Sequence, residues 1–233
     1  MIFDLHVHTT YASGDSNLSP REMVEESNRI GLEGVCLTEH SGPWDIFEFR
    51  RFTERQNNLL IINAIEIETD VGHITVFGLG GYVPGIRNPR SLRRVADRTG
   101  AFVVLAHPFR NLLHKAPYNA TNLLFKGWDP LPSTVDEALN HPAFELVDAI
   151  EVGNGATIDS ENNLAWEVAK RLGKPMVGGS DAHSVNGLGR FVTVLHHDVK
   201  NQDEFLEALH AGEFYPATGL LDGELMAMKP RIV

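Results

Sequence analysis

Short apolar segments alternate with amphipathic segments along the whole chain, and this alternation predicts the fold. Apolar runs that predict strands occupy residues 2–8, 34–38, 59–67, 73–79, 101–106, 147–152, 175–179 and 191–195. Helical periodicity predicts helices at 19–31, 44–57, 91–98, 133–140, 160–172 and 202–210. Strands and helices that alternate at this density favour an α/β fold with a parallel sheet or a barrel. Because the sequence shows neither a repeat nor a linker, we expect one domain over residues 1–233.

One stretch interrupts the alternation. Residues 110–132 contain several Asn and Pro residues and show no periodicity, and they closely follow His107-Pro108. A loop of this length inside a compact domain is usually functional or mobile. We therefore expect an active-site loop that selects the substrate, and the alternative is a tolerated surface insertion.

The composition is typical of a soluble protein. Of the 233 residues, 42% are hydrophobic, yet no apolar run approaches the roughly 18 residues that a membrane span needs. Asp4 and His6 stand where a signal peptide would need an unbroken apolar run. A single cysteine, Cys36, excludes an internal disulfide framework. These features predict a cytoplasmic location and no membrane partner.

The charge limits the partners. The chain carries 20 Lys and Arg residues against 31 Asp and Glu residues, a formal net charge of −11. Such a surface repels long polyanions, so we expect no stable binding of long nucleic acids. A small anionic substrate stays compatible with this charge if the site itself is positive.

The placement of the histidines points to a metal site. His6 and His8 lie two residues apart on a predicted strand, so their side chains and that of Asp4 project from one face. Paired imidazoles at this spacing can converge on one cation. Asp4 would either orient a ligating imidazole or form a buried structural hydrogen bond.

Similar residues recur after the first pair. Asp15 lies in a Gly-rich turn, and on or just after other predicted strands lie His40, Glu66, His73, His107, Asp181 and His183. In a parallel barrel the C-terminal ends of the strands meet at one face, where active sites lie. Six histidines and three carboxylates would therefore line one cavity. For each histidine alone, a buried structural role is the alternative.

The combination resembles a known family. The spacing His6-x-His8, Asp15, His40, Glu66, His73, His107 and Asp181-x-His183 is similar to that of the PHP (polymerase and histidinol phosphatase) family. The resemblance covers residues 2–195 and implies a distorted (β/α)7 TIM-like barrel with its active site at the C-terminal ends of the strands. It also implies a stand-alone metal-dependent phosphoesterase with two to three divalent ions, which are zinc, manganese or iron.

The resemblance assigns the ligands of each ion. The first ion would be held by His6, His8, Glu66 and Asp181. The second ion would share Glu66 and add His73 and His107. The third ion would be held by Asp15, His40 and His183. Some family members have His where this chain has Asp15, which implies a weaker or different third ion, and His73 follows Glu66 more closely than in longer members.

The implied reaction is hydrolysis of a phosphoester by a metal-bound hydroxide, because a bound metal lowers the pKa of water to about 7. Glu66, Asp181 and His183 would be the catalytic residues. The substrate would be a small phosphorylated metabolite, a nucleotide or a short oligonucleotide.

Three further residues are candidates for substrate binding. Arg110 and Arg190 can each form a bidentate phosphate clamp, and the alternative for each is a surface ion pair. Asn154 follows the predicted strand 147–152, which also carries Glu151. Both would bind the substrate or the ligand histidines, or pack the loop.

Two other functions keep the metals. Amidohydrolase barrels hydrolyse carbon–nitrogen bonds and often use a carboxylated lysine as the bridging ligand, whereas here Glu66 holds that position. A catalytically silent, metal-stabilised module, as in some DNA polymerases, is the second alternative. A substrate panel of phosphomonoesters, oligonucleotides and amides separates the three.

Overall fold

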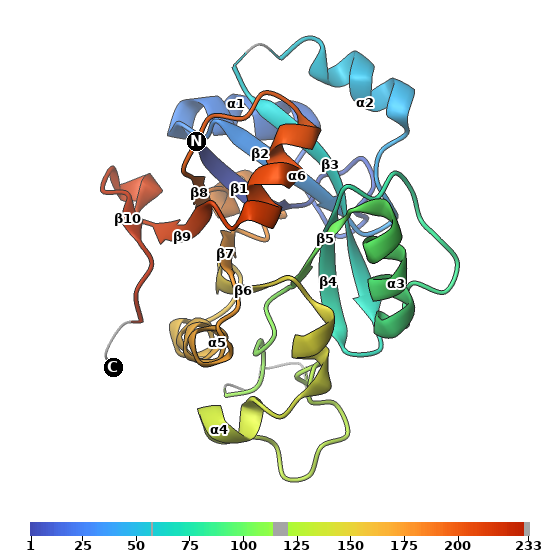
Figure 1. Cartoon of the computed structure of the whole chain (residues 1–233). Coiled ribbons are helices and arrows are strands. Elements are labelled where there is room, and N and C mark those ends of the chain that lie inside the picture. Colours follow the sequence, from blue (N-terminus) through green and yellow to red (C-terminus); the bar gives the residue numbers. More distant parts are fainter. Residues whose placement is uncertain (57, 114–120, 231–233) are drawn as a thin grey trace.

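The computed structural model describes residues 1–56, 58–113 and 121–230. Over these residues the chain is an α/β fold built on one curled sheet of ten strands (Figure 1). The strands are β1 Ile2–Val7, β2 Gly34–Glu39, β3 Leu60–Thr69, β4 Gly72–Phe77, β5 Phe102–Leu105, β6 Ala149–Asn154, β7 Met176–Gly179, β8 Phe191–Leu195, β9 Phe214–Thr218 and β10 Met226–Ala227. Their order in the sheet is β10-β9-β8-β1-β2-β3-β4-β5-β6-β7.

Six α-helices occupy the described connections. They are α1 Pro20–Ile30, α2 Ile46–Thr53, α3 Pro89–Thr99, α4 Val135–Ala138, α5 Asp159–Leu172 and α6 Gln202–Ala211. Single 3₁₀ turns lie at Pro142–Leu146, Val185–Gly187 and Leu220–Asp222. Local chemistry sets the helix ends, as α1 illustrates: Ser19 and Glu22 form a capping box at its start, and Gly31, at φ 84°, ends it.

The predicted elements are present, with three differences. The helix expected over 44–57 is the shorter α2, and the one expected over 133–140 is the four-residue α4. The strands β9 and β10 were not expected from the sequence. Strand β9 contains Pro216, which lowers strand propensity, and β10 has two residues, too few to give a periodic signal.

The sheet is a curled half-barrel, which corrects the expectation of a distorted (β/α)7 TIM-like barrel. Parallel pairs join β1 to β2, β2 to β3, β5 to β6 and β6 to β7, but the other five pairs are antiparallel. The reason is clearest at β4. Only Asp70 and Val71 separate β3 from β4, and a parallel partner needs a connection of about a dozen residues or more.

The free edge of β7 comes back against β1 and β8 through side chains rather than through a strand ladder. The backbone N–H of Gly178 donates to Oγ1 of Thr193 (2.9 Å), which in turn donates to the carbonyl of Gly178 (2.8 Å). A Cβ at Gly179 would lie 2.5 Å from Cβ of His6. Glycine is therefore required for β7 to approach the strand that carries the first predicted metal ligands.

The core lies between the curled sheet and its helices. Leu92 of α3 and Val168 of α5 are buried in one apolar cluster with Val103 of β5 and Ile150 of β6. In the described part of the chain, every helix is too short or too polar to span a lipid bilayer.

Candidate metal centre

The nine predicted ligands gather at one end of the curled sheet. His6 lies on β1, and His8, His40, His107, Asp181 and His183 follow the ends of β1, β2, β5 and β7. His73 reaches this end by a different route, because β4 runs antiparallel to β3 and begins where β3 ends. Its register partner is Glu68, two residues beyond Glu66.

The buried carboxylate of Glu66 lies at the centre of the group. Five imidazole nitrogens approach its two oxygens: Nδ1 of His73 (3.1 Å), Nε2 of His107 (3.1 Å), Nε2 of His6 (3.2 Å), Nδ1 of His40 (3.2 Å) and Nε2 of His8 (3.5 Å). These histidines come from four strands or their ends. Glu66 therefore has the surroundings of a bridging ligand.

Asp181 forms a second buried carboxylate beside Glu66. Its Oδ1 lies 3.3 Å from Nε2 of His8, 3.6 Å from Nε2 of His6 and 3.6 Å from Nδ1 of His183. Asp181 has a φ of 53°, and His107 has a φ of 30°. Left-handed backbone at non-glycine residues is uncommon and clusters at functional sites.

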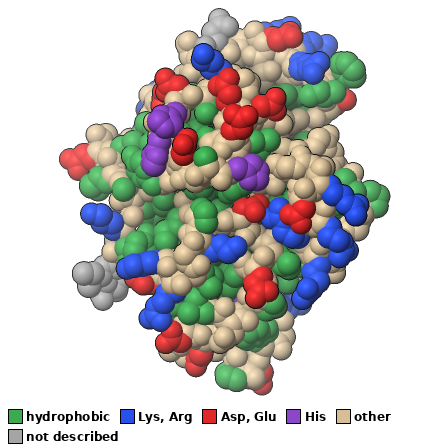
Figure 2. Space-filling model, in the orientation of Figure 1, with side chains coloured by type: hydrophobic (Ala, Val, Ile, Leu, Met, Phe, Trp, Pro, Cys, Tyr) green, Lys and Arg blue, Asp and Glu red, His purple; other side chains and the backbone are tan. Residues whose placement is uncertain are grey.

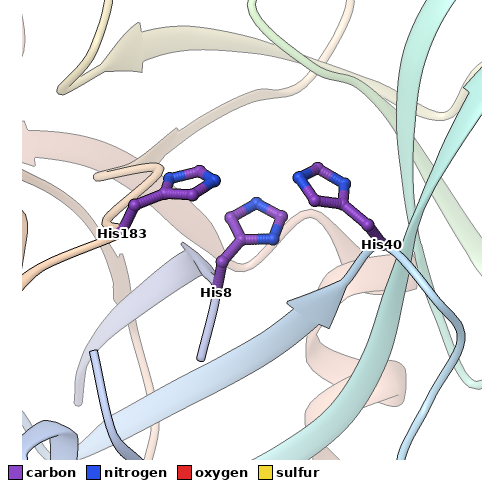
Figure 3. A group of neighbouring side chains, drawn as sticks. All are labelled: His8, His40 and His183. Carbon is purple, nitrogen blue, oxygen red and sulfur yellow. The ribbon is translucent and has the colours of Figure 1, made fainter. Parts of the chain in front are cut away.

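The third group is more open to solvent. The rings of His8, His40 and His183 lie side by side (Figure 3), with centroids 4.2 Å apart for His8 and His40 and 4.4 Å for His8 and His183. Oδ2 of Asp15 lies 3.3 Å from Nε2 of both His40 and His183. His8 thus adjoins this group as well as the first one, to which the family resemblance assigned it.

These residues fit divalent cations. Nε2 of His6 and Nε2 of His8 are buried and make no hydrogen bond within the described residues, although carboxylate oxygens lie nearby. An unpaired buried polar atom costs about 1–3 kcal/mol and needs an explanation, such as an ion. Potential ligand atoms lie within 4.8 Å of one another in three groups: His8, His40 and His183; His6, Glu66 and His107; His6, His8 and Asp181.

Glu151 supports the ligand histidines from behind. Its Oε1 lies 2.9 Å from Nδ1 of His6, and its Oε2 accepts hydrogen bonds from the backbone N–H of His107 and from Nδ2 of Asn154 (2.8 Å each). Of the roles left open by the sequence, the structure places Glu151 against the histidines. Hydrogen-bonded partners of this kind orient ligating imidazoles.

His8 has a comparable support that the sequence did not reveal. Its Nδ1 lies 3.2 Å from Oγ of Ser13, which donates to Oε2 of Glu39 (2.6 Å). Glu39 is fully buried and also accepts hydrogen bonds from the backbone of Thr9 and from Nε1 of Trp44 (3.0 Å each). The one available signal was the carboxylate next to His40 at a strand end.

Two roles were expected for Asp4, to orient a ligating imidazole or to form a buried structural hydrogen bond, and its contacts are those of the second role. Its carboxylate accepts hydrogen bonds from the backbone N–H groups of Ser180 (2.8 Å), Gly189 (3.0 Å) and His6 (3.2 Å). Burial raises the pKa of Asp4 to about 6. Asp4 therefore fastens the segments that follow β7 to the start of β1.

The electrostatics of the group favour ligation. Burial is the largest single influence on the pKa values of Glu66 and Asp181, and it acts to raise them. The neighbours together outweigh burial and hold both pKa values well below their usual range: His6, His107 and His73 act on Glu66, and His6, His8, Arg110 and His107 act on Asp181. Burial lowers the pKa values of His8 and His107. Metal ligands need charged carboxylates and neutral imidazoles, which these shifts promote.

His6 behaves differently from its neighbours. Burial opposes its protonation, but the carboxylates of Glu151, Asp181 and Glu66 outweigh burial and raise its pKa well above the usual value. The surroundings of its imidazole thus favour positive charge, as a cation site does.

Arg110 reaches the ligands, and Asn154 holds it there. Nη2 of Arg110 donates to Oδ1 of Asn154 (2.7 Å) and pairs with Oδ2 of Asp181, and its Nε donates to Thr157 (3.2 Å). The amide of Asn154 is fully buried, and it bonds to Glu151, Thr157 and the backbone of Ala156 as well as to Arg110. Asn154 therefore holds the guanidinium of Arg110 beside Asp181.

Arg190 lies further out. It is exposed, and its Nη1 donates to the carbonyl of Gly155 (3.4 Å). The structure therefore brings Arg110, but not Arg190, into contact with a predicted ligand.

The described parts of the 110–132 segment border the same group. Nδ2 of Asn122 donates to the carbonyls of Pro108 (2.8 Å) and Arg110 (2.9 Å). Residues 121–124 line a small cavity of about 70 Å³ together with His73 and His107. Residues 114–120 of the predicted loop lie outside the described residues.

The chain matches two family models. Residues 4–145 match the PHP domain, and residues 159–214 match the PHP-associated model. An error-prone DNA polymerase from Nocardia farcinica is 34% identical over 104 residues, which are 43% of this chain and 8% of the polymerase. This chain thus matches a small part of that relative. An uncharacterized protein from Methanocaldococcus jannaschii is 24% identical over 181 residues, which cover 72% of this chain and 92% of that protein.

Solved structures share the fold at low sequence identity. A two-domain protein from Bacteroides vulgatus, containing a predicted PHP-like metal-dependent phosphoesterase, is 22% identical with a TM-score of 0.63, over 93% of this chain and 64% of that one. Endonuclease Q in complex with a 27-mer duplex substrate is 18% identical with a TM-score of 0.56, over 91% and 57% of the two chains. Because the PHP domain model matches more than half of its residues, the chain belongs to the PHP domain family.

Proposed function

We propose that this chain is a metal-dependent phosphoesterase that acts on a small phosphorylated substrate, including nucleotides and short oligonucleotides. The observation that carries the proposal is the pair of buried, unpartnered Nε2 atoms of His6 and His8, which lie 3.2–3.6 Å from the carboxylates of Glu66 and Asp181. The phosphoesterase named in the similar structure from Bacteroides vulgatus supports it.

The nine predicted ligands would hold two to three divalent ions. Imidazole and carboxylate together accept zinc, manganese and iron. When bound, such ions lower the pKa of water to about 7 and neutralise charge on phosphoryl oxygens. Glu66 would bridge two ions, Asp181 would hold one of them, and Asp15 and His183 would bind at the open side.

The remaining residues position these groups and the substrate. Glu151 orients His6, and Ser13 with Glu39 orients His8. The guanidinium of Arg110 contacts the predicted ligand Asp181. When a metal ion neutralises the carboxylate of Asp181, this guanidinium would be free to bind two oxygens of the phosphate. Glu66, Asp181 and His183 would be the catalytic ligands.

The substrate would be small. The face of the molecule in Figure 2 carries both acidic and basic side chains, with several Lys and Arg side chains gathered along the edge where α3 lies, and the net charge of the chain is −11. Endonuclease Q binds a DNA duplex in the similar structure. A short oligonucleotide fits the proposal better here, because a long polyanion needs a basic surface.

A second candidate is an amidohydrolase, the name given to a similar structure from Chromobacterium violaceum (17% identity, TM-score 0.56). A catalytically silent module is the third, in view of the polymerase match. Glu66 lies at the centre of the predicted ligands, where amidohydrolases often have a carboxylated lysine. This difference favours phosphoester hydrolysis over the second candidate. The complete set of nine ligands favours an enzyme over the third.

The test is a hydrolysis screen of the purified chain with manganese, zinc or iron supplied separately. The panel contains phosphomonoesters, nucleotides, short oligonucleotides and amides, and Glu66→Gln is the control for a contaminating hydrolase. We expect phosphate release or oligonucleotide cleavage by the parent that the variant lacks. Hydrolysis of amides alone, or none by the fully metal-loaded protein, would overturn the proposal.

A further inference from the structure

A cleft beside the metal ligands contains residues that the proposed function does not use. The cleft has a volume of about 330 Å³. His40, Glu66 and His73 line it on the side of the ligands, and Glu68, Tyr82 and Arg87 also line it. Among the described lining residues, Arg87 is the one Lys or Arg. The positive side chain of Arg87 thus lies beside an expected phosphate site, in a chain whose net charge is −11.

The backbone of Arg87 is held in place. Ile86, which precedes it, is buried, and Asn88, which follows it, caps α3 by accepting a hydrogen bond from the N–H of Ser91 (3.0 Å). The carbonyl of Arg87 accepts a hydrogen bond from the N–H of Asp70 (3.0 Å) at the β3–β4 turn. The guanidinium therefore extends from a fixed point next to the strands that carry Glu66 and His73.

Its present partner is easily exchanged. Nη2 of Arg87 lies 3.2 Å from Oε2 of Glu68, with side chains 60% and 64% exposed. Ion pairs this exposed contribute little to stability, so an incoming anion can replace Glu68 at low cost. Glu68 is also the register partner of His73, so the exchange would occur beside a predicted ligand.

Two guanidinium groups flank His73 in this arrangement. His73 lines both the cleft with Arg87 and the smaller cavity with Arg110. Arg110 contacts the predicted ligand Asp181, whereas Arg87 lines the cleft and pairs with Glu68, which is not a predicted ligand. Arg110 is therefore suited to the phosphate that reacts, and Arg87 to a different part of the same substrate.

We propose that Arg87 is a specificity-determining residue, which binds a second anionic group on the alcohol part of the substrate. The substrate class would be a phosphoester whose leaving group carries a carboxylate or another phosphate, both of which a guanidinium can bind through two oxygens. This inference rests on the proposed phosphoesterase function.

The experiment compares three aryl phosphates that share one phenyl ring and differ in the group opposite the phosphate: phenyl phosphate, 4-carboxyphenyl phosphate and 1,4-phenylene bisphosphate. The measured quantity is kcat/KM for each anion-bearing compound divided by kcat/KM for phenyl phosphate. Because the chemical reactivity of each compound is the same for every variant, changes in this ratio report recognition. The two anion-bearing compounds distinguish a carboxylate from a phosphate as the group that Arg87 binds.

We expect Arg87→Ala to lower the ratio about tenfold or more for at least one anion-bearing compound. Arg90→Ala is the matched control, since it removes the same charge from an exposed residue that does not line the cleft, and its ratio should equal that of the parent. Glu68→Gln should raise the ratio, because Arg87 loses its competing partner. Equal ratios for the parent and Arg87→Ala would overturn the inference.

Binding without turnover separates this inference from the proposed function. Calorimetric titration with phenylphosphonate, 4-carboxyphenylphosphonate and 1,4-phenylenebisphosphonate needs no hydrolysis. If the protein hydrolysed neither the phosphoesters of the substrate panel nor the three aryl phosphates, but Arg87→Ala selectively weakened binding of an anion-bearing phosphonate, the proposed function would fail and the Arg87 site would stand. If Arg87→Ala weakened all three phosphonates equally, or none, the Arg87 site would fail by itself.

Discussion

Nδ1 of His6 lies 2.9 Å from Oε1 of Glu151, and this contact joins strand β1 to strand β6. A carboxylate only accepts hydrogen bonds, so Nδ1 carries a proton, and Nε2, which faces Glu66 and Asp181, is the nitrogen that would bind a cation once it is deprotonated. Two residues 145 positions apart thus set the tautomer that a ligating histidine requires.

Replacing Glu151 by Gln should weaken metal binding about 10- to 100-fold, the usual effect of losing a partner of a ligating histidine. The amide no longer fixes the proton on Nδ1 of His6. Calorimetric titration of the metal-free protein with manganese or zinc measures the change. Glu145→Gln, at an exposed position of the 3₁₀ helix that precedes β6, is the control. Equal affinities for all three proteins would show that Glu151 does not orient His6.

Glu66→Gln should lower activity and metal content far more than Asp15→Asn. Glu66 approaches five imidazoles and is buried, whereas Asp15 approaches two and its side chain is 59% exposed. We expect Glu66→Gln to lose at least one ion per chain and Asp15→Asn to lose only the third ion. Elemental analysis together with kcat tests this, and similar losses in both variants would contradict the bridging role.

Arg110→Ala should raise KM for a phosphomonoester several-fold without loss of metal. Removing the guanidinium takes away a phosphate partner, but it also frees Asp181 from its ion pair, so metal affinity should stay equal or increase. Arg110→Lys should recover part of the loss in KM, because a lysine keeps the charge but not the bidentate geometry. A drop in bound metal on Arg110→Ala would argue that Arg110 only supports the ligands.

The gathering of the predicted ligands could be expected from the sequence, because strand geometry places them. Alternation along the first strand aims His6 and His8 at one face, and strand ends that share one edge bring His40 and His107 to them. The pattern could not show that β4 runs antiparallel. The turn at Asp70-Val71 lacks the Asn-Gly or Asp-Gly signal of a hairpin.

The supporting contacts were beyond sequence reasoning for another reason. The contact of Ser13 with Glu39, and that of Arg110 with Asp181, span 26 and 71 residues. Such pairs depend on how strands order themselves in the sheet, which local propensity does not encode. Asn154 illustrates the result, since the sequence showed its place at a strand end but not the bonds of its buried amide to Arg110 and Glu151.

The single thiol should make the protein less stable at alkaline pH. Burial raises the pKa of Cys36 well above the usual 9.0. Above pH 9 the unfolded chain therefore releases a proton that the folded chain keeps, and the free energy of unfolding falls by about 1.4 kcal/mol per pH unit from this group. Urea unfolding between pH 8 and 10.5 should show a steeper loss for the parent than for Cys36→Ala. Parallel curves would mean that the folded protein ionises Cys36 as readily as the unfolded chain.

Phe125→Ala should destabilise the fold by about 3–5 kcal/mol, the usual cost of removing a buried phenylalanine side chain. Phe125 lies in the segment 110–132, which is either packed into the fold beside the site or a tolerated surface insertion. Its side chain is fully buried, and its ring centroid lies 5.9 Å from that of Phe109 and 5.1 Å from that of Trp128. Phe109 in turn follows His107 by two residues, so the anchor of the segment adjoins a predicted metal ligand.

The control for Phe125 is Leu131→Ala in the same segment. Leu131 is 46% exposed, so its truncation should change the free energy of unfolding by no more than about 0.5 kcal/mol. Urea denaturation of both variants and the parent measures the difference. If Phe125→Ala were as mild as Leu131→Ala, the segment would be a tolerated insertion, and its place beside His107 would have no part in holding the site.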